Sequence, residues 1–261
     1  MASAPCGEQG LRKYQFTKGG KLKTILGFLL LLFASSAFGS VSFVQATPVA
    51  GGAGTSVTAN FGSSVTAGDA ICLFLAVENF PSPLSVTVSD PNASVYTLAA
   101  SVPRGGFLAV WCTADALGSP GSVTASFSVP TIARAVAIEY SGNAGAFSGL
   151  IGNSATLTGS APCGIPAGWG FTYNPCPTTG PTAMTTGGVT VQAGSLVAIF
   201  GGGLVGTPTV STPWTSRATD SASLIELADQ SFSSLTAGVT GAMSDPATND
   251  RWGLLLLELR Q

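Results

Sequence analysis

Beyond Ser40 the chain alternates short runs of apolar and β-branched residues with turn residues, and it has almost no pattern of helical period. Runs of this length, separated by turns such as Asp-Pro-Asn and Gly-Ser-Pro-Gly, are typical of an all-β protein. We therefore expect a single two-sheet antiparallel β-sandwich of the jelly-roll or double Greek key type. The expected strands of the first half are VSFVQA, TSVTANF, AICLFLAV, LSVTVSD, VYTLAAS, GFLAVWCTA, SVTASFSV and ARAVAIEY.

The second half repeats the landmarks of the first. The sequence VTAGD at 65–69 leads into the apolar run ICLFLAV, and VQAGS at 191–195 leads into LVAIFGG. The run RAVAIEY, which contains Glu139, closes the first half, and WGLLLLEL, which contains Glu258, closes the second. Such an echo indicates an internal repeat.

The expected pseudo-repeats span residues 65–140 and 191–259, and we expect each half to contribute strands to both sheets. The glycines of the two echoed sequences, Gly68 and Gly194, are expected to lie in turns that feed a central strand. Those central strands are continuously apolar, which is consistent with burial on both faces.

The first 39 residues have the pattern of a signal peptide. Five basic residues precede the apolar run at 25–39, which is shorter than the about 20 residues of a membrane span. Small residues at Ala37 and Gly39 predict cleavage before Ser40, so that residues 40–261 form the sandwich domain. The alternative is that the segment is kept as a membrane anchor.

Composition excludes several classes of chemistry. The chain has no histidine, and it has no lysine after Lys23. A Ser-His-Asp triad, a His-ligated zinc site and a Schiff-base lysine are therefore excluded from the mature part. Cleavage before Ser40 leaves five arginines against eleven carboxylates, a net charge of −6. An acidic surface argues against binding to nucleic acid or to an anionic membrane.

Four cysteines follow the expected cleavage site, and an even number in an exported chain favours disulfides. Cys163 and Cys176 enclose a segment rich in Gly, Pro and aromatic residues, so we expect them to staple an inserted loop at 160–180. Cys72 and Cys112 lie in strand-like runs and are either bridged neighbours or two buried thiols.

The combination of TAGD before an apolar strand, VTVSDPNASVYTL, AIEYSG and a terminal WGLLLLELR resembles a broad group of exported bacterial jelly-roll or Ig-like β-sandwich domains. The resemblance covers nearly all of residues 41–261. It implies a sandwich fold and export, and it carries no assigned active site, because the shared motifs are turn and strand signatures.

Aromatic residues of the stapled loop are the first candidate for a binding site. Trp169, Phe171 and Tyr173 alternate, so an extended segment would place all three on one side, where aromatic faces stack on sugars or partner surfaces. The alternative is that these side chains cover an edge of the sandwich. The other tryptophans of the mature chain, Trp111, Trp214 and Trp252, lie in or beside strands, which favours the core.

Carboxylates and amides supply two further candidates. Asp245, Asn249 and Asp250 are loop oxygens of the kind that Ca²⁺ prefers, although the same residues are ordinary in turns. Glu139 and Glu258 would suit a glycosidase if they faced each other across a groove. Their matching positions are equally explained as strand-end residues that bond loop backbone or pair with Arg134, Arg251 or Arg260.

We therefore expect an exported, non-catalytic binding module for a glycan or a protein, secreted or at the cell surface. Two alternatives stay open. The first is a structural protein that self-associates through its sheet edges, and the second is a carboxylate-dependent carbohydrate-active enzyme. No cofactor other than Ca²⁺ is indicated by the sequence.

Overall fold

The computed structural model describes residues 39–78, 84–103, 107–143, 145–160, 182–203, 207–220, 225–245 and 251–261. These residues form antiparallel β-strands almost throughout, which confirms the predicted all-β, sandwich-like fold. The helix α2 (Phe147–Leu150), a single turn, joins the two halves of the chain. Among the described residues, no helix has the length and apolar character needed to cross a membrane.

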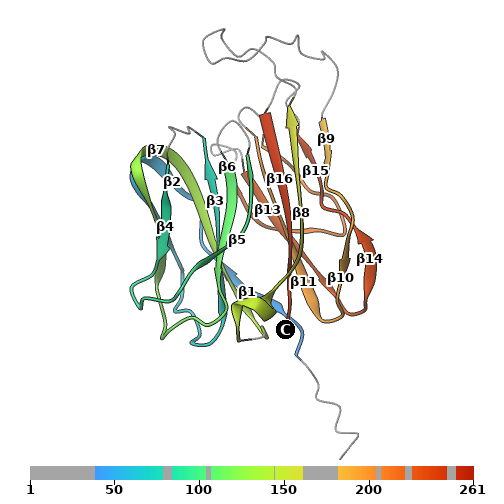
Figure 1. Cartoon of the computed structure of the whole chain (residues 1–261), viewed down its shortest axis with the longest axis horizontal. Coiled ribbons are helices and arrows are strands. Elements are labelled where there is room, and N and C mark those ends of the chain that lie inside the picture. The colour runs from blue at the N-terminus through green and yellow to red at the C-terminus, as the bar shows by residue number, and fades with distance from the viewer. Residues whose placement is uncertain are drawn as a thin grey trace, which may run out of the picture. The chain divides into compact units, whose positions relative to one another are not determined.

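The first half forms one five-stranded antiparallel path in the order β1-β7-β3-β6-β5, and β2 and β4 also pair with β7. Figure 1 shows these strands in blue to green. Their bounds are β1 (Ser42–Ala46), β2 (Ala50–Asn60), β3 (Ala70–Val77), β4 (Val86–Ser89), β5 (Thr97–Pro103), β6 (Phe107–Thr113) and β7 (Ser122–Ser141).

The second half forms a five-stranded antiparallel sheet in the order β8-β16-β11-β13-β12, with two small sheets, β10-β14 and β15-β9, beside it. These strands are yellow to red in Figure 1. Their bounds are β8 (Ile151–Ser160), β9 (Thr182–Thr185), β10 (Val189–Val191), β11 (Ser195–Gly202), β12 (Thr215–Asp220), β13 (Ile225–Phe232), β14 (Thr236–Val239), β15 (Ala242–Asp245) and β16 (Arg251–Leu259).

The two five-stranded paths have the same topology and the same register. Ile71 of β3 lies opposite Glu139 of β7, and Val197 of β11 lies opposite Glu258 of β16. Each central strand follows a glycine with positive φ, 90° at Gly68 and 80° at Gly194, a conformation that costs glycine little. The landmarks predicted from the sequence therefore occupy equivalent positions in two copies of one unit.

Irregularities in the ladders are repeated as well. The edge strand β5 has a register shift between Leu98 and Ala100. The edge strand β12 has one between Ser216 and Ala218, at the matching place. A bulge re-aims the side chain of the extra residue, and this residue is Ala99 in the first copy and Arg217 in the second.

The structure differs from the prediction that each half of the chain contributes strands to both sheets. Each copy builds its own five-stranded sheet, and the two sheets share one apolar cluster that includes Phe74, Tyr140, Phe200 and Leu257. The opposite face of each sheet has a further cluster of its own, with Leu73 and Val123 in the first copy and Ile199 and Met243 in the second. The two central strands β3 and β11 are therefore covered on both faces, which explains why they are continuously apolar.

The outer layer of the first copy comes from the bending of β7. Its pairing with β2 jumps from Gly54↔Thr131 to Ser56↔Ser126, so the four residues 127–130 of β7 stand against the single residue Thr55 of β2. The last of these, Pro130, has no N–H to donate to a ladder, which suits a break in pairing. The start of β7 thus pairs with β2 and β4 and packs Val123 and Ala125 over the five-stranded sheet.

Candidate ligand-binding groove

A groove of about 310 Å³ lies in the second copy. This volume is at the lower end of the range typical of small-ligand sites, about 300–1,000 Å³. Its wall combines two aromatic rings, a carboxamide, three hydroxyls and small apolar groups. The lining residues are Ser211, Thr212, Pro213, Trp214, Gln230, Phe232, Val239, Thr240 and Ala242.

Three segments position this lining. A turn closed by a bond from the Trp214 N–H to the Ser211 carbonyl presents the indole at the start of β12. Gln230 and Phe232 are two residues apart near the end of β13, so the alternation of a strand places both side chains on one face. Trp214 and Phe232 also pack against the outer apolar cluster of the second copy, which anchors both rings.

Among the residues that the structure describes, no charged side chain lines the groove. The rings of Trp214 and Phe232 are half-buried, whereas Ser211, Thr212 and Thr240 are exposed at the rim. Such a site offers an apolar platform and neutral hydrogen-bonding groups. It favours an uncharged ligand, since burying a charge without a partner is costly.

The first copy has different residues at the same register. Thr97 lies opposite Cys112 as Thr215 lies opposite Asp229, so Tyr96 corresponds to Trp214 and Thr113 corresponds to Gln230. Trp111 packs against the outer cluster of the first copy and contacts Phe107 edge to face, with ring centroids 6.4 Å apart. The second copy has Ala228 at the position of Trp111.

The aromatic site that the sequence predicts is not tested by the structure. Trp169, Phe171 and Tyr173, with Cys163 and Cys176, lie outside the described residues, so that site and its staple stay predictions. Trp214, expected in the core, does pack against it but also lines the groove. The turn sequence Thr-Pro-Trp between polar residues was the available signal for a presented aromatic ring.

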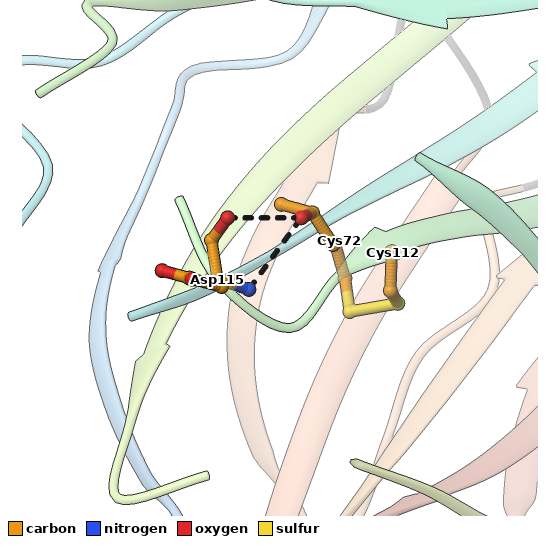
Figure 2. The surroundings of a disulfide bond; sticks show 4 residues. Cys72, Cys112 and Asp115 are labelled. Carbon is orange, nitrogen blue, oxygen red and sulfur yellow. Dashed lines mark hydrogen bonds between the residues drawn. A yellow bond between two sulfur atoms is a disulfide. The ribbon is translucent and has the colours of Figure 1, made fainter. Parts of the chain in front are cut away.

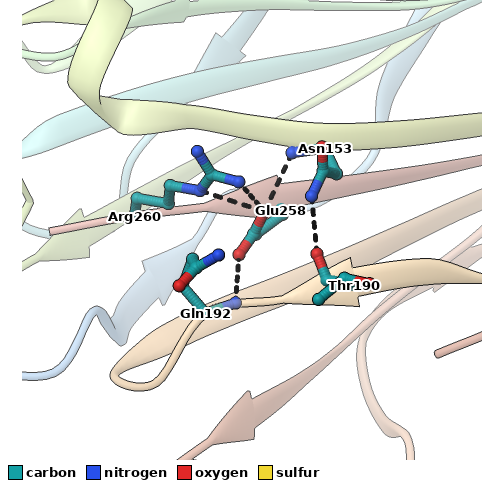
Figure 3. Close-up of polar contacts among 5 residues, drawn as sticks. All are labelled: Asn153, Thr190, Gln192, Glu258 and Arg260. Carbon is teal, nitrogen blue, oxygen red and sulfur yellow. Dashed lines mark hydrogen bonds and ion pairs between the residues drawn. The ribbon is translucent and has the colours of Figure 1, made fainter. Parts of the chain in front are cut away.

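Glu258 is a buried structural carboxylate, as Figure 3 shows. Its Oε1 accepts a bond of 2.6 Å from the Gln192 N–H, and its Oε2 accepts one of 2.8 Å from the Asn153 N–H. Arg260 adds an ion pair of 2.7 Å to Oε2. Burial raises the pKa of Glu258, but the bonds from Arg260 and the two N–H groups outweigh it and lower this pKa overall.

Glu139 has the matching role in the first copy. Its Oε1 accepts a bond of 2.7 Å from the Thr66 N–H, and its Oε2 accepts one of 2.6 Å from the Gln45 side chain. Both glutamates are fully buried and hold the turn that precedes a central strand. They are thus engaged with loop backbone, one of the two interpretations that the sequence left open, and neither presents a free carboxylate to a groove.

The partner of the glutamate differs between the copies. Asp69 lies beside Glu139, whereas the equivalent residue beside Glu258 is Ser195. Burial, together with the hydrogen bond and the negative charge of Glu139, raises the pKa of Asp69 to about 6. The first copy therefore has a carboxyl pair where the second has a carboxylate and an arginine.

Another buried carboxylate, Asp229, lies at the contact between the copies. Arg217 forms an ion pair of 2.8 Å with Asp229 and stacks over the ring of Phe43 at 4.0 Å. Burial raises the pKa of Asp229, although Arg217 opposes the rise. Burial and the charge of Asp229 also raise the pKa of Tyr140, which places this tyrosine next to the pair.

The predicted calcium site stays untested. Asp245 is the last residue of β15, and Asn249 and Asp250 lie outside the described residues. Within the part of the chain that the structure describes, no group of three or more Asp, Glu, Cys or His residues could hold a metal ion.

Cys72 and Cys112 form a disulfide, which decides between the two alternatives that the sequence left open. The cysteines lie directly opposite each other on β3 and β6, with their Cα atoms 4.1 Å apart, and both are fully buried (Figure 2). Just beyond the bridge, the Thr113 hydroxyl donates a bond to the carbonyl of Asp115. At the equivalent pair of positions, the second copy has Ala198 and Asp229.

No protein-family model matches the chain, and the comparisons found neither a similar curated protein nor a similar solved structure.

Proposed function

We propose that this protein is an exported, non-catalytic binding module, secreted or at the cell surface, and that it binds a glycan in the groove at Trp214. The groove is the observation that carries the proposal, because it joins aromatic rings to neutral hydrogen-bonding groups on a rigid sheet. A protein ligand is the alternative occupant at the same surface.

Export is supported by two independent features. The basic and apolar pattern of the first 39 residues has the form of a signal peptide. The Cys72–Cys112 disulfide is a bond that persists in oxidising compartments and is rare in the cytosol.

Binding to sugars is supported by the chemistry of the groove. An aromatic side chain offers a large apolar surface and has few rotatable bonds. Ordering such a side chain when a sugar ring binds therefore costs little conformational entropy. Trp214 and Phe232 are anchored in the outer cluster, and Gln230 supplies both donors and an acceptor for hydroxyl groups.

The experiment is a glycan-array screen of the exported, disulfide-bonded protein, with size-exclusion analysis of the same sample. We expect binding that Trp214→Ala weakens about tenfold, which corresponds to about 1.4 kcal/mol. Val95→Ala, which trims an exposed apolar residue of the first copy, is the control and should leave binding unchanged. A protein that binds no glycan but self-associates with increasing concentration would contradict the proposal and favour the structural alternative.

A further inference from the structure

We infer that two molecules of this protein pair through the outer edge of β2, where residues 56–60 of one molecule add to the same strand of the other. The partner is therefore a second molecule of the same chain. The inference goes beyond the proposed function, because the surface belongs to the first copy of the unit and does not include the groove. Three features carry it: the position of β2 at an edge, the lack of protection of that edge, and the alternation of its side chains.

The strand β2 lies at one edge of the outer layer of the first copy. Among the residues that the structure describes, it pairs with β7 alone, whereas β7 has β2 on one side and β4 on the other. The side chains of Ser56, Thr58 and Asn60 are exposed. The outward N–H and C=O groups of an edge strand can form a ladder with a strand of another molecule.

The other described edges carry features that hinder such pairing. The strands β1, β5, β8 and β12 each have a register shift in their ladder, and a bulge turns an edge away from a flat partner. The strand β12 also carries Arg217 and Asp220, and β4 has only four residues. In contrast, residues 56–60 of β2 pair with β7 without a shift and include neither a charged residue nor a proline.

The ladder between β2 and β7 shows what a partner of β2 must look like. On its outer face, the hydroxyl oxygens of Thr58 and Thr124 are 2.9 Å apart. On its inner face, Val57 lies opposite Ala125, and both are buried in the outer cluster of the first copy. A partner strand must keep this parity, because a slip of one residue would turn its apolar side chains to the solvent. The β2 strand of a second molecule has the required alternation by identity.

Pairing of β2 with itself also limits the size of the assembly. Two identical edge strands pair antiparallel about a two-fold axis, and such an isologous contact closes at two molecules. With the axis near Val57, Ser56 of one molecule lies opposite Thr58 of the other, and hydroxyl pairs of this kind are favourable across an antiparallel ladder. The contact involves few residues and is smaller than a standard interface, so we expect a weak dimer.

The test measures the molar mass of the full exported protein by sedimentation equilibrium at concentrations up to about 1 mM, where a weak dimer is populated. Ser56→Lys/Thr58→Lys places like charges opposite each other across the two-fold axis, and Ser56→Asp/Thr58→Asp does the same with the opposite sign. Thr87→Lys/Ser89→Lys is the matched control, because it adds the same charges at exposed hydroxyl positions of β4, on the other edge of this layer. Thermal unfolding of each variant checks that it folds.

We expect the parent and the β4 control to dimerise with the same dissociation constant, and the two β2 variants to dimerise at least tenfold more weakly. An equimolar mixture of the Lys and Asp variants of β2 should regain the dimer, because opposite charges then face each other. A parent that stays monomeric throughout, or one that grows beyond a dimer with concentration, would overturn the inference. A dimer that persists in both β2 variants, or a mixture that stays monomeric, would overturn it as well.

Discussion

Phe74 and Phe200 occupy the same position in the two copies and contact each other edge to face, with ring centroids 5.5 Å apart. Phe74 lies opposite Val110 and Val136, and Phe200 lies opposite Leu227 and Leu255. A residue that touches its own equivalent lies next to a two-fold axis, as in an isologous dimer. The two sheets therefore pack as a dimer within one chain, with this ring pair at its centre.

Truncation of either ring should destabilise the whole domain. Both rings are fully buried, so Phe74→Ala and Phe200→Ala should each reduce the free energy of unfolding in urea by about 3–5 kcal/mol. The double variant should lose less than the sum of the two, by about 0.5–1.5 kcal/mol for the shared contact. Leu235→Ala, at a side chain that is 64% exposed, is the control and should change stability by less than about 0.5 kcal/mol. Strictly additive effects would argue against the ring contact.

The sequence was sufficient to predict the fold class and the paired landmarks, because turn glycines and buried strands have local signatures. Gly68 and Gly194 have positive φ, and each precedes a strand that is buried throughout. The sequence could not predict which layer covers each face of these strands, because a continuously apolar run has no polar side to orient it.

The groove could not be predicted for a different reason. Its lining combines the turn before β12, the end of β13 and residues 239–242, and these segments come together only in the folded sheets. The buried pair of Arg217 and Asp229 depends in the same way on the bulge in β12.

The Cys72–Cys112 bridge should contribute to stability mainly through the unfolded state. It closes a loop with a sequence separation of 40 residues, for which loop-closure entropy gives about 4 kcal/mol. The double variant Cys72→Ala/Cys112→Ala should therefore have a free energy of unfolding in urea that is lower by about that amount. Because both cysteines are fully buried, the native protein should resist reducing agents until it unfolds.

Peptide mapping of the oxidised protein provides the companion measurement. It should recover Cys72 linked to Cys112 and, as the sequence predicts, Cys163 linked to Cys176. Any cross-linked peptide that joins the two pairs would contradict both assignments.

Removal of Arg217 should be costly because it leaves Asp229, which is 1% exposed, without its counter-charge. Breaking a buried pair in this way costs about 3 kcal/mol or more. We therefore expect Arg217→Met to lower the urea midpoint, and Arg217→Met/Asp229→Leu to recover most of the loss. Arg134→Met is the control. The contact of Arg134 with Glu78 is 4.0 Å long and partly exposed, so its loss should reduce the free energy of unfolding by less than about 1 kcal/mol. A double variant as unstable as Arg217→Met would contradict the assigned role of the charge pair.

The carboxyl pair of the first copy should make stability depend on pH. The pKa of Asp69 is raised from its ordinary value of 3.8 to about 6 in the folded protein, so the folded state binds this proton more tightly than the unfolded state. The resulting stabilisation is fully present below pH 3.8 and is lost as the pH rises through 6. Above that pH, an ionised Asp69 repels Glu139 at the turn before β3.

Asp69→Ser places in the first copy the residue that the second copy has at Ser195. We expect the difference in unfolding free energy between the parent and this variant to change between pH 4.5 and pH 7.5, with the parent relatively more stable on the acidic side. Glu258→Gln is the matched control of opposite sign: the pKa of Glu258 is lowered, so its contribution is present above its ordinary value of 4.5 and is lost on further acidification. Equal pH profiles for the parent and Asp69→Ser would show that the pKa of Asp69 is not raised in the folded protein.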